Sequence, residues 1–198
     1  ASHSFAVVVN DTQMPVLTGV PADVNLNNDA GQCSATYNWL LPEFTDNCGI
    51  ASFNGTHDSG DTFPSGQTTV SYVLTDLSGN ILESSFVVTV EDVELPEISG
   101  LPTSFSVAND PGQCGANVNW VPPVASDNCS VADFDASHLP GVFLPIGITT
   151  IHYSVMDGTG LTTLASFEIL VDDEEAPMIN GMPAYRTIDS APGLCSVV

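Results

Sequence analysis

The segment QTTVSYVLTDLSGNILESSFVVTV, residues 67–90, carries the pattern that decides the fold. Apolar side chains alternate with polar ones in both halves of this segment, and such a period of two is typical of β-strands with one buried face. The Leu-Ser-Gly-Asn sequence at residues 77–80 separates the halves and predicts a hairpin turn. The inward positions are Val70, Tyr72 and Leu74 before the turn, and Phe86, Val88 and Val90 after it.

The same segment returns at a fixed interval. Cys33, Cys114 and Cys195 are equally spaced (114 − 33 = 195 − 114 = 81), and no insertion or deletion is needed. A unit of this length can carry a core of its own, so we predict complete repeats at residues 12–92 and 93–173. Residues 1–11 match the last strand of a preceding repeat, and residues 174–198 match the start of a following, truncated one. We therefore expect this chain to be a segment of a longer tandem-repeat polypeptide, or alternatively a processed filament subunit.

The rest of the repeat consists of short β-rich runs broken by Gly, Pro, Asn and Asp, without helical periodicity. In the first copy we expect further strands at residues 23–27, 33–39 and 50–56, and an irregular segment at residues 40–49. Trp39 alternates inward and predicts a buried aromatic core. The predicted fold is all-β: tandem immunoglobulin-like β-sandwiches with about seven strands per repeat.

Charge and composition exclude several classes of protein. The net charge is −23, Arg186 is the only Lys or Arg, and 43% of residues are hydrophobic. Binding to nucleic acid or to anionic lipid requires clustered basic side chains, so neither is expected. No apolar run reaches the 18 residues that would suggest a membrane span, and no signal peptide is present. Cysteines in an acidic, lysine-free chain indicate an oxidising environment, outside the cell.

The cysteines predict disulfides. Two pairs have equal spacing (48 − 33 = 129 − 114 = 15), so we expect Cys33 to bond Cys48 and Cys114 to bond Cys129. Cys195 is then the first member of a third pair, left unpaired because its partner would follow Val198. Zinc spacing is absent. A bridge that closes about 15 residues contributes roughly 3 kcal/mol in the chain-entropy model.

Acidic residues concentrate where one repeat meets the next. Carboxylates held close together repel one another unless a cation lies between them, and Ca²⁺ prefers such oxygen ligands. Ca²⁺ at the inter-domain junctions is therefore the one cofactor that we consider. The alternatives are a solvated acidic linker and, for the aspartates of loops, ordinary turn chemistry. The candidate ligands are Asp11, Asp46, Asp76, Glu91, Asp92, Glu94, Asp127, Asp157, Asp172, Asp173 and Glu174.

Three asparagines, Asn10, Asn54 and Asn128, lie in Asn-x-Ser/Thr sequences that could accept a glycan in a secreted protein. None of the three motifs recurs one repeat later, so chance is the alternative. His57 and His138 are periodic, but no nucleophile motif accompanies both copies. We therefore predict no enzymatic activity and no catalytic residue.

Taken together, these motifs resemble the hyalin repeat, or HYR domain. The resemblance implies an immunoglobulin-like fold, an extracellular location and a role in adhesion or structural arrays, without catalysis. The second copy departs from the pattern at Leu161, where the first has Asn80. The matching residues in the first copy are Pro15, Gly31, Cys33, Ala35, Trp39, Pro42, Asp46, Asn47, Cys48, Phe63, Pro64, Gly66, Thr68, Thr69, Tyr72, Asp76, Gly79, Asn80, Phe86 and Asp92.

The predicted function is a structural or adhesive segment of an extracellular tandem-repeat protein. Its expected partners are neighbouring repeats or identical subunits. Residues 4–10 form a strand without a repeat of their own, so one hypothesis is a filament joined by strand complementation. The alternative is an adhesion module that binds glycans or surface proteins through loops such as residues 57–63.

Overall fold

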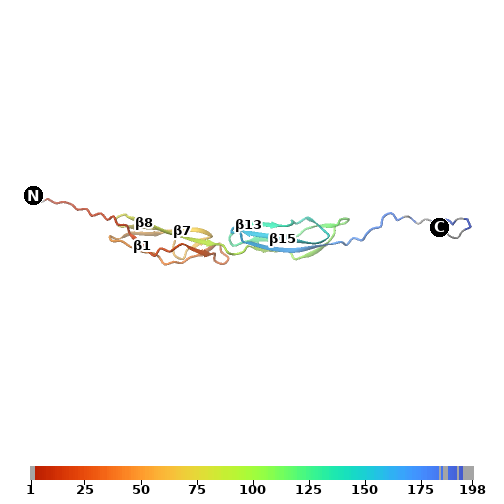
Figure 1. Ribbon diagram of the computed structural model, residues 1–198, viewed down its shortest axis with the longest axis horizontal. Helices are drawn as coiled ribbons and strands as arrows, with labels where there is room; N and C mark the ends of the chain where they lie inside the picture. Colours follow the sequence, from red (N-terminus) through yellow and green to blue (C-terminus); the bar gives the residue numbers. More distant parts are fainter. Residues whose placement is uncertain (1–2, 183, 185–186, 191, 194–198) are drawn as a thin grey trace.

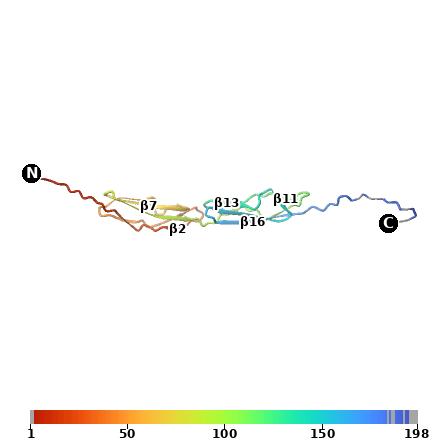
Figure 2. The same cartoon turned by 45° about the horizontal axis from the view of Figure 1, so that its top comes forward.

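The computed structural model describes residues 3–182, 184, 187–190 and 192–193. In this part of the chain all regular secondary structure is β-strand, and none of it is a helix that could cross a membrane. Two sets of eight strands lie end to end along one long axis (Figures 1 and 2). The predicted fold class, tandem immunoglobulin-like sandwiches, is confirmed. We call the two sets the first sandwich (β1–β8) and the second sandwich (β9–β16).

The strands of the two sandwiches correspond one to one. Those of the first are β1 Val16–Thr18, β2 Val24–Asn27, β3 Ser34–Thr36, β4 Glu43–Thr45, β5 Ile50–Gly55, β6 Thr62–Pro64, β7 Gly66–Asp76 and β8 Ile81–Glu91. Those of the second are β9 Glu97–Ser99, β10 Phe105–Ala108, β11 Gly115–Val118, β12 Val124–Ser126, β13 Val131–Ala136, β14 Val142–Pro145, β15 Gly147–Asp157 and β16 Thr162–Asp172.

Each sandwich has one long sheet faced by short strand pairs. The first sheet has the order β2-β8-β7-β5, in which β2 runs parallel to β8 and the other neighbours are antiparallel. The pairs β1–β4 and β3–β6 form the opposite layer, and the second sandwich repeats this topology. The segment expected to be irregular, residues 40–49, contains β4, because its backbone pairs with the proline-flanked β1. The predicted loop at residues 57–63 likewise contains the start of a strand, β6, which pairs with β3.

The core residues are those that the alternating pattern predicts. Val70, Tyr72 and Leu74 on β7 are at most 1% exposed. Their counterparts on β15 are at most 3% exposed. The Trp39 indole lies in this core and donates a hydrogen bond of 2.7 Å to the Tyr72 hydroxyl. Trp120 and Tyr153 repeat the bond at 2.8 Å. These aromatic rings therefore serve packing, and their polar atoms are satisfied inside the core.

The strand pair β7–β8 sets the length of each sandwich. Eleven residues of β7, at a rise of about 3.3 Å each, separate its ends by roughly 30 Å. We call the end at the β7–β8 turn, residues 77–80, the amino pole, because the incoming chain contacts it there through Asn80. The opposite end, where β8 leaves toward the second sandwich, is the carboxyl pole. The second sandwich has the same two poles.

Candidate functional site at the junction of the sandwiches

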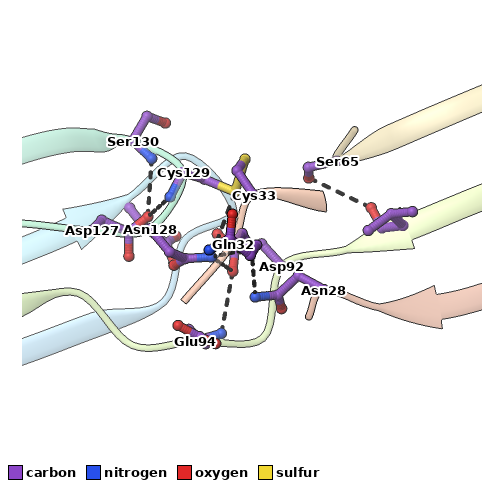
Figure 3. Close-up of a disulfide and its surroundings, with 12 residues drawn as sticks. Asn28, Gln32, Cys33, Ser65, Asp92, Glu94, Asp127, Asn128, Cys129 and Ser130 are labelled. Atoms are coloured by element: carbon purple, nitrogen blue, oxygen red, sulfur yellow. Dashed lines mark hydrogen bonds between the residues drawn. A yellow bond between two sulfur atoms is a disulfide. The ribbon is translucent and has the colours of Figure 1, made fainter. Parts of the chain in front are cut away.

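A disulfide crosses from one sandwich to the other. Cys33, at the carboxyl pole of the first sandwich, bonds Cys129, at the amino pole of the second (Figure 3). Their Cα atoms are 4.6 Å apart, and 96 residues separate them in sequence. The prediction of bridges within each repeat, Cys33 to Cys48 and Cys114 to Cys129, is wrong.

The reason is the length of the sandwich. Cys33 lies beside the start of β7, since its carbonyl accepts a hydrogen bond from the amide of Ser65. Cys48 lies beside the end of β7, where Leu77 donates to the carbonyl of Gly49. About 30 Å of strand therefore separates the two cysteines, whereas a disulfide requires Cα atoms roughly 4.4–6.8 Å apart. Cys48 and Cys114 are free and exposed, and Cys195 lies outside the described residues.

Three aspartates meet at the same junction. Asp92 follows β8, Asp127 lies in the turn before Cys129, and Asp157 ends β15. Each offers a carboxylate oxygen, and these oxygens all lie within 4.8 Å of one another. Asp92 and Asp157 are 6% and 1% exposed, so two of the three charges are buried. We call this set the middle triad.

Each aspartate of the middle triad uses one oxygen to hold its own backbone turn. Asp127 accepts bonds from the amides of Cys129 and Ser130 at 2.8 and 2.9 Å through Oδ2. Asp157 accepts from the amides of Thr159 and Leu161 through Oδ1. The remaining oxygens, Asp92 Oδ2, Asp127 Oδ1 and Asp157 Oδ2, are buried and have no hydrogen-bond partner. The turns thus hold three unpartnered carboxylate oxygens together.

A second triad lies one repeat earlier, at the amino pole of the first sandwich. Asp11, Asp46 and Asp76 occupy the equivalent positions, again with oxygens within 4.8 Å of one another. Asp11 Oδ2 and Asp46 Oδ1 are buried without a partner. Asp76 Oδ2 differs, because the Asn80 side-chain amide donates a bond of 2.7 Å to it. We call this set the entry triad.

Two of the buried aspartates, Asp76 and Asp157, are ionised in spite of their burial. Burial raises the pKa of Asp157, but hydrogen bonds from the Thr159 hydroxyl and from nearby backbone amides outweigh that effect and hold the pKa below its ordinary value. Asp76 is similar: burial raises its pKa, but hydrogen bonds from the side chain and amide of Asn80 outweigh that effect and hold the pKa below its ordinary value. Both triads therefore carry negative charge at neutral pH.

Among the described residues, the other predicted ligands join neither triad. Glu94 Oε1 instead accepts a bond of 2.7 Å from the amide of Gly31, whose φ of 70° suits glycine. Asp173 caps its own linker by accepting from the amide of Glu175. The backbone of Glu174 donates to the Asn109 side chain. The side chains of Glu91 and Asp172 are exposed.

Sequence reasoning missed the role of Asn128. Its side-chain amide donates to the Gln32 carbonyl at 3.0 Å and to Asp92 Oδ1 at 3.2 Å, so it links both sandwiches (Figure 3). A glycan on the Asn128 nitrogen would have to displace these bonds. Asn10 and Asn54, the other predicted acceptors, are exposed. The sequence signal for Asn128 is the Asp-Asn-Cys motif, which recurs at residues 46–48 and 127–129.

The loop histidines show no catalytic arrangement in the part of the chain that the structure describes. The His57 ring packs against Phe63 at a centroid distance of 5.2 Å. The neighbouring Ser59 hydroxyl is occupied, because it donates to the Trp39 carbonyl at 2.7 Å and accepts from the Trp39 amide. His138 contacts the Ser137 hydroxyl. These residues order the loops that lead into the core.

Comparison with known proteins agrees with this architecture. The HYR domain profile matches twice, at residues 10–90 and 91–171. The chain is 32% identical to hyalin of Lytechinus variegatus over 95% of its own length and 37% of that protein. It is also 32% identical to hyalin of Strongylocentrotus purpuratus, over 97% of this chain and 17% of that protein. The chain thus spans well under half of these relatives.

Solved structures show a looser likeness. A protocadherin gammaB7 EC3-6 cis-dimer structure matches with a TM-score of 0.39 and 15% identity, over 83% of this chain and 52% of that one. The HYR profile and the hyalin relatives place the chain outside the cell, secreted or at the cell surface, and indicate a non-enzymatic module. The chain belongs to the HYR domain family, of which it contains two tandem copies.

Proposed function

We propose that this chain is a stiff structural segment of an extracellular adhesive array, in which Ca²⁺ at each junction fixes the orientation of neighbouring sandwiches. The middle triad is the observation that carries the proposal. It takes one carboxylate from the end of the first sandwich and two from the second, and the same triad recurs one repeat earlier. A cation bound there would contact both sandwiches.

The chemistry of the triads fits Ca²⁺. Calcium binds oxygen ligands at about 2.3–2.6 Å, so two ligands on opposite sides of the ion lie up to about 5 Å apart. The oxygens of each triad lie within 4.8 Å of one another. Unpaired buried carboxylates are costly, and residues 3–182 contain no lysine or arginine that could neutralise them. An external cation would supply the missing positive charge.

Isothermal titration calorimetry of the full chain with CaCl₂, after removal of metals with a chelator, tests this proposal. We expect saturable binding and a higher midpoint of thermal unfolding in Ca²⁺ than in chelator. Asp92→Asn keeps the oxygen that caps the linker but removes the charge, so binding at the middle triad should be lost. The matched control is Asp133→Asn, an exposed position on β13. Equal midpoints in Ca²⁺ and chelator would overturn the proposal.

Stiffness needs a separate measurement. Small-angle X-ray scattering should give a longer maximum dimension and a narrower distribution of shapes for the wild-type chain in Ca²⁺ than in chelator. Asp92→Asn should remove most of that difference. Ca²⁺ binding without any change in inter-domain flexibility would leave a metal site but refute its mechanical role.

Strand complementation between copies is a further proposal about assembly. Phe5, Val7 and Val9 are 89%, 74% and 90% exposed. Their counterparts one repeat later, Phe86, Val88 and Val90, are at most 2% exposed in the core. Residues 4–10, predicted as a strand, form none in this structure. This apolar segment could complete the sheet edge of another copy. Light scattering should then show concentration-dependent oligomers that disappear when residues 1–10 are deleted, and a strictly monomeric full chain would rule the idea out.

A further inference from the structure

We propose that Cys48 and Cys114 are halves of two further inter-domain disulfides, so that one disulfide closes every junction of the array. The cysteine at the carboxyl pole of each sandwich would bond the cysteine at the amino pole of the next. The proposal rests on the tandem array proposed above, and it assigns a partner to both free thiols.

The carboxyl pole of the second sandwich is built like that of the first. Around Cys33, Gly31 donates to Glu94 at 2.7 Å and the Asn28 side chain accepts from the amide of Val93 at 3.0 Å. Around Cys114 the same two bonds recur one repeat later: Gly112 donates to Glu175 at 2.9 Å, and Glu174 donates to the Asn109 side chain at 3.1 Å. The turn that presents Cys33 to its partner is therefore already formed around Cys114.

The amino pole of the first sandwich likewise repeats that of the second. Asp46 Oδ2 accepts bonds from the amides of Cys48 and Gly49 at 2.7 and 3.1 Å. Asp127 makes the equivalent pair of bonds around the disulfide-bonded Cys129. The backbone thus presents the Cys48 thiol at the position that Cys129 uses for its bridge.

Neither free cysteine can find a partner within the two sandwiches. Cys48 lies at the amino pole of the first sandwich, beside the hydrogen bond from Leu77 to Gly49, and Cys114 lies at the carboxyl pole of the second, where its carbonyl accepts from the amide of Ile146. Each sandwich is roughly 30 Å long. Cys33 and Cys129 are already bonded to each other. Both free thiols are exposed and accessible to a neighbouring repeat.

The bond-forming step balances with a small-molecule disulfide as oxidant. One thiol, as its thiolate, attacks the oxidant and forms a mixed disulfide while a thiolate leaves. The second protein thiolate then displaces the other half. Two protein thiols thereby lose two electrons and two protons, and one oxidant disulfide becomes two thiols.

A three-sandwich chain tests the proposal: residues 1–173 followed by a second copy of residues 93–173. The second copy contains every strand of the second sandwich in unbroken 81-residue register. After oxidation with glutathione disulfide, non-reducing peptide mapping should show Cys33 bonded to Cys129, and Cys114 bonded to the Cys129 of the appended copy. Cys48 and the appended Cys114 should remain free.

Maleimide labelling gives a second readout. Labelling of Cys114 should fall at least about tenfold between the natural chain and the three-sandwich chain, because a disulfide removes the reactive thiolate. Cys114→Ser should leave the appended Cys129 reactive and Cys33–Cys129 intact. Undiminished labelling of Cys114, or any peptide that joins Cys33 to Cys48, would overturn the proposal.

The peptide mapping of the three-sandwich chain is carried out in chelator, so that the disulfides it detects form without calcium. A bridge at each junction without calcium binding would support this inference and refute the proposed role of Ca²⁺. Calcium binding with an unbridged Cys114 would do the reverse.

Discussion

The middle junction and the entry side of the first sandwich contain equivalent sets of three aspartates, one repeat apart, but differ in what surrounds them. At the middle junction, Cys129 is bonded to Cys33 and Asn128 donates to Gln32. On the entry side, Cys48 is free. The entry triad nevertheless forms, because Asp11 reaches it from the linker alone. The carboxylate cluster therefore forms from one sandwich and its linker. The disulfide and the Asn128 hydrogen bond form only where a neighbouring sandwich is present.

The largest effect should come from the disulfide. Replacing Cys129 with Ser removes a cross-link that closes 96 residues, which the chain-entropy model values at about 4.7 kcal/mol for a loop of that size. Urea unfolding at neutral pH should show a loss of that order. Cys48→Ser, the matched change at the entry side, should leave the unfolding curve unchanged. Equal losses in both variants would mean that the two sides do not differ as the structure indicates.

An intermediate effect should come from the residue that distinguishes the triads. Asn80 donates to Asp76 Oδ2, whereas Leu161 leaves Asp157 Oδ2 without a partner. Leu161→Asn should place a competing donor at the middle triad and weaken Ca²⁺ binding there by about tenfold, the worth of one hydrogen bond.

The reciprocal variant, Asn80→Leu, should strengthen Ca²⁺ binding at the entry triad while destabilising the metal-free chain by roughly 1–3 kcal/mol, since it leaves a buried oxygen unpaired. Calorimetric titration and unfolding in chelator measure the two quantities. Ca²⁺ affinities that do not respond to either exchange would show that the amide is not what separates the sites.

Acid should destabilise the chain through the buried aspartates. The pKa values of Asp76 and Asp157 are lowered in the folded state, because hydrogen bonds to the carboxylates outweigh the opposing effect of burial. Their contribution to stability is therefore complete above the unfolded pKa, near 4, and is lost as the pH falls through the lower folded pKa. Thermal midpoints in metal-free buffer should drop below about pH 4. Asp157→Asn should flatten that drop, and an unchanged slope would contradict the assignment.

The smallest effect concerns the reactivity of Cys48. The nearby Asp11 carboxylate raises the pKa of the exposed Cys48 thiol most, and the charges of Asp46 and Asp76 raise it further. A cation in the entry triad would neutralise those charges and lower the pKa. Iodoacetamide should therefore alkylate Cys48 faster in Ca²⁺ than in chelator, as peptide mass spectrometry can measure. An alkylation rate of Cys48 that is the same in Ca²⁺ and in chelator would show that the ion does not bind at the entry triad.

The alternation of apolar residues was sufficient to predict the strands that build the core. The residues predicted to point inward on β7 and β8 are buried, because a two-residue period leaves only one face on which they can pack. The short β4 was not predictable in this way. Its pairing with β1 depends on backbone hydrogen bonds across 25 or more residues, which leave no local pattern.

The candidate site was predictable in composition but not in arrangement. Acidic character at the junction indicated an oxygen-ligand site, and all six triad members were among the candidates. Five other acidic residues were equally plausible in sequence, since only the three-dimensional positions of the turns decide which oxygens converge. The triads take residues from three loops far apart in the chain.

The sequence by itself determined the repeat, its all-β character and the recurrence of every cysteine at one interval. It could not determine which cysteines bond. Spacings of 15 residues within a repeat and of 96 residues between repeats follow the same period equally well. Only the tertiary structure decided between them, because an eleven-residue strand holds Cys33 and Cys48 at opposite poles, whereas the end-to-end stacking of the sandwiches brings Cys33 and Cys129 into contact.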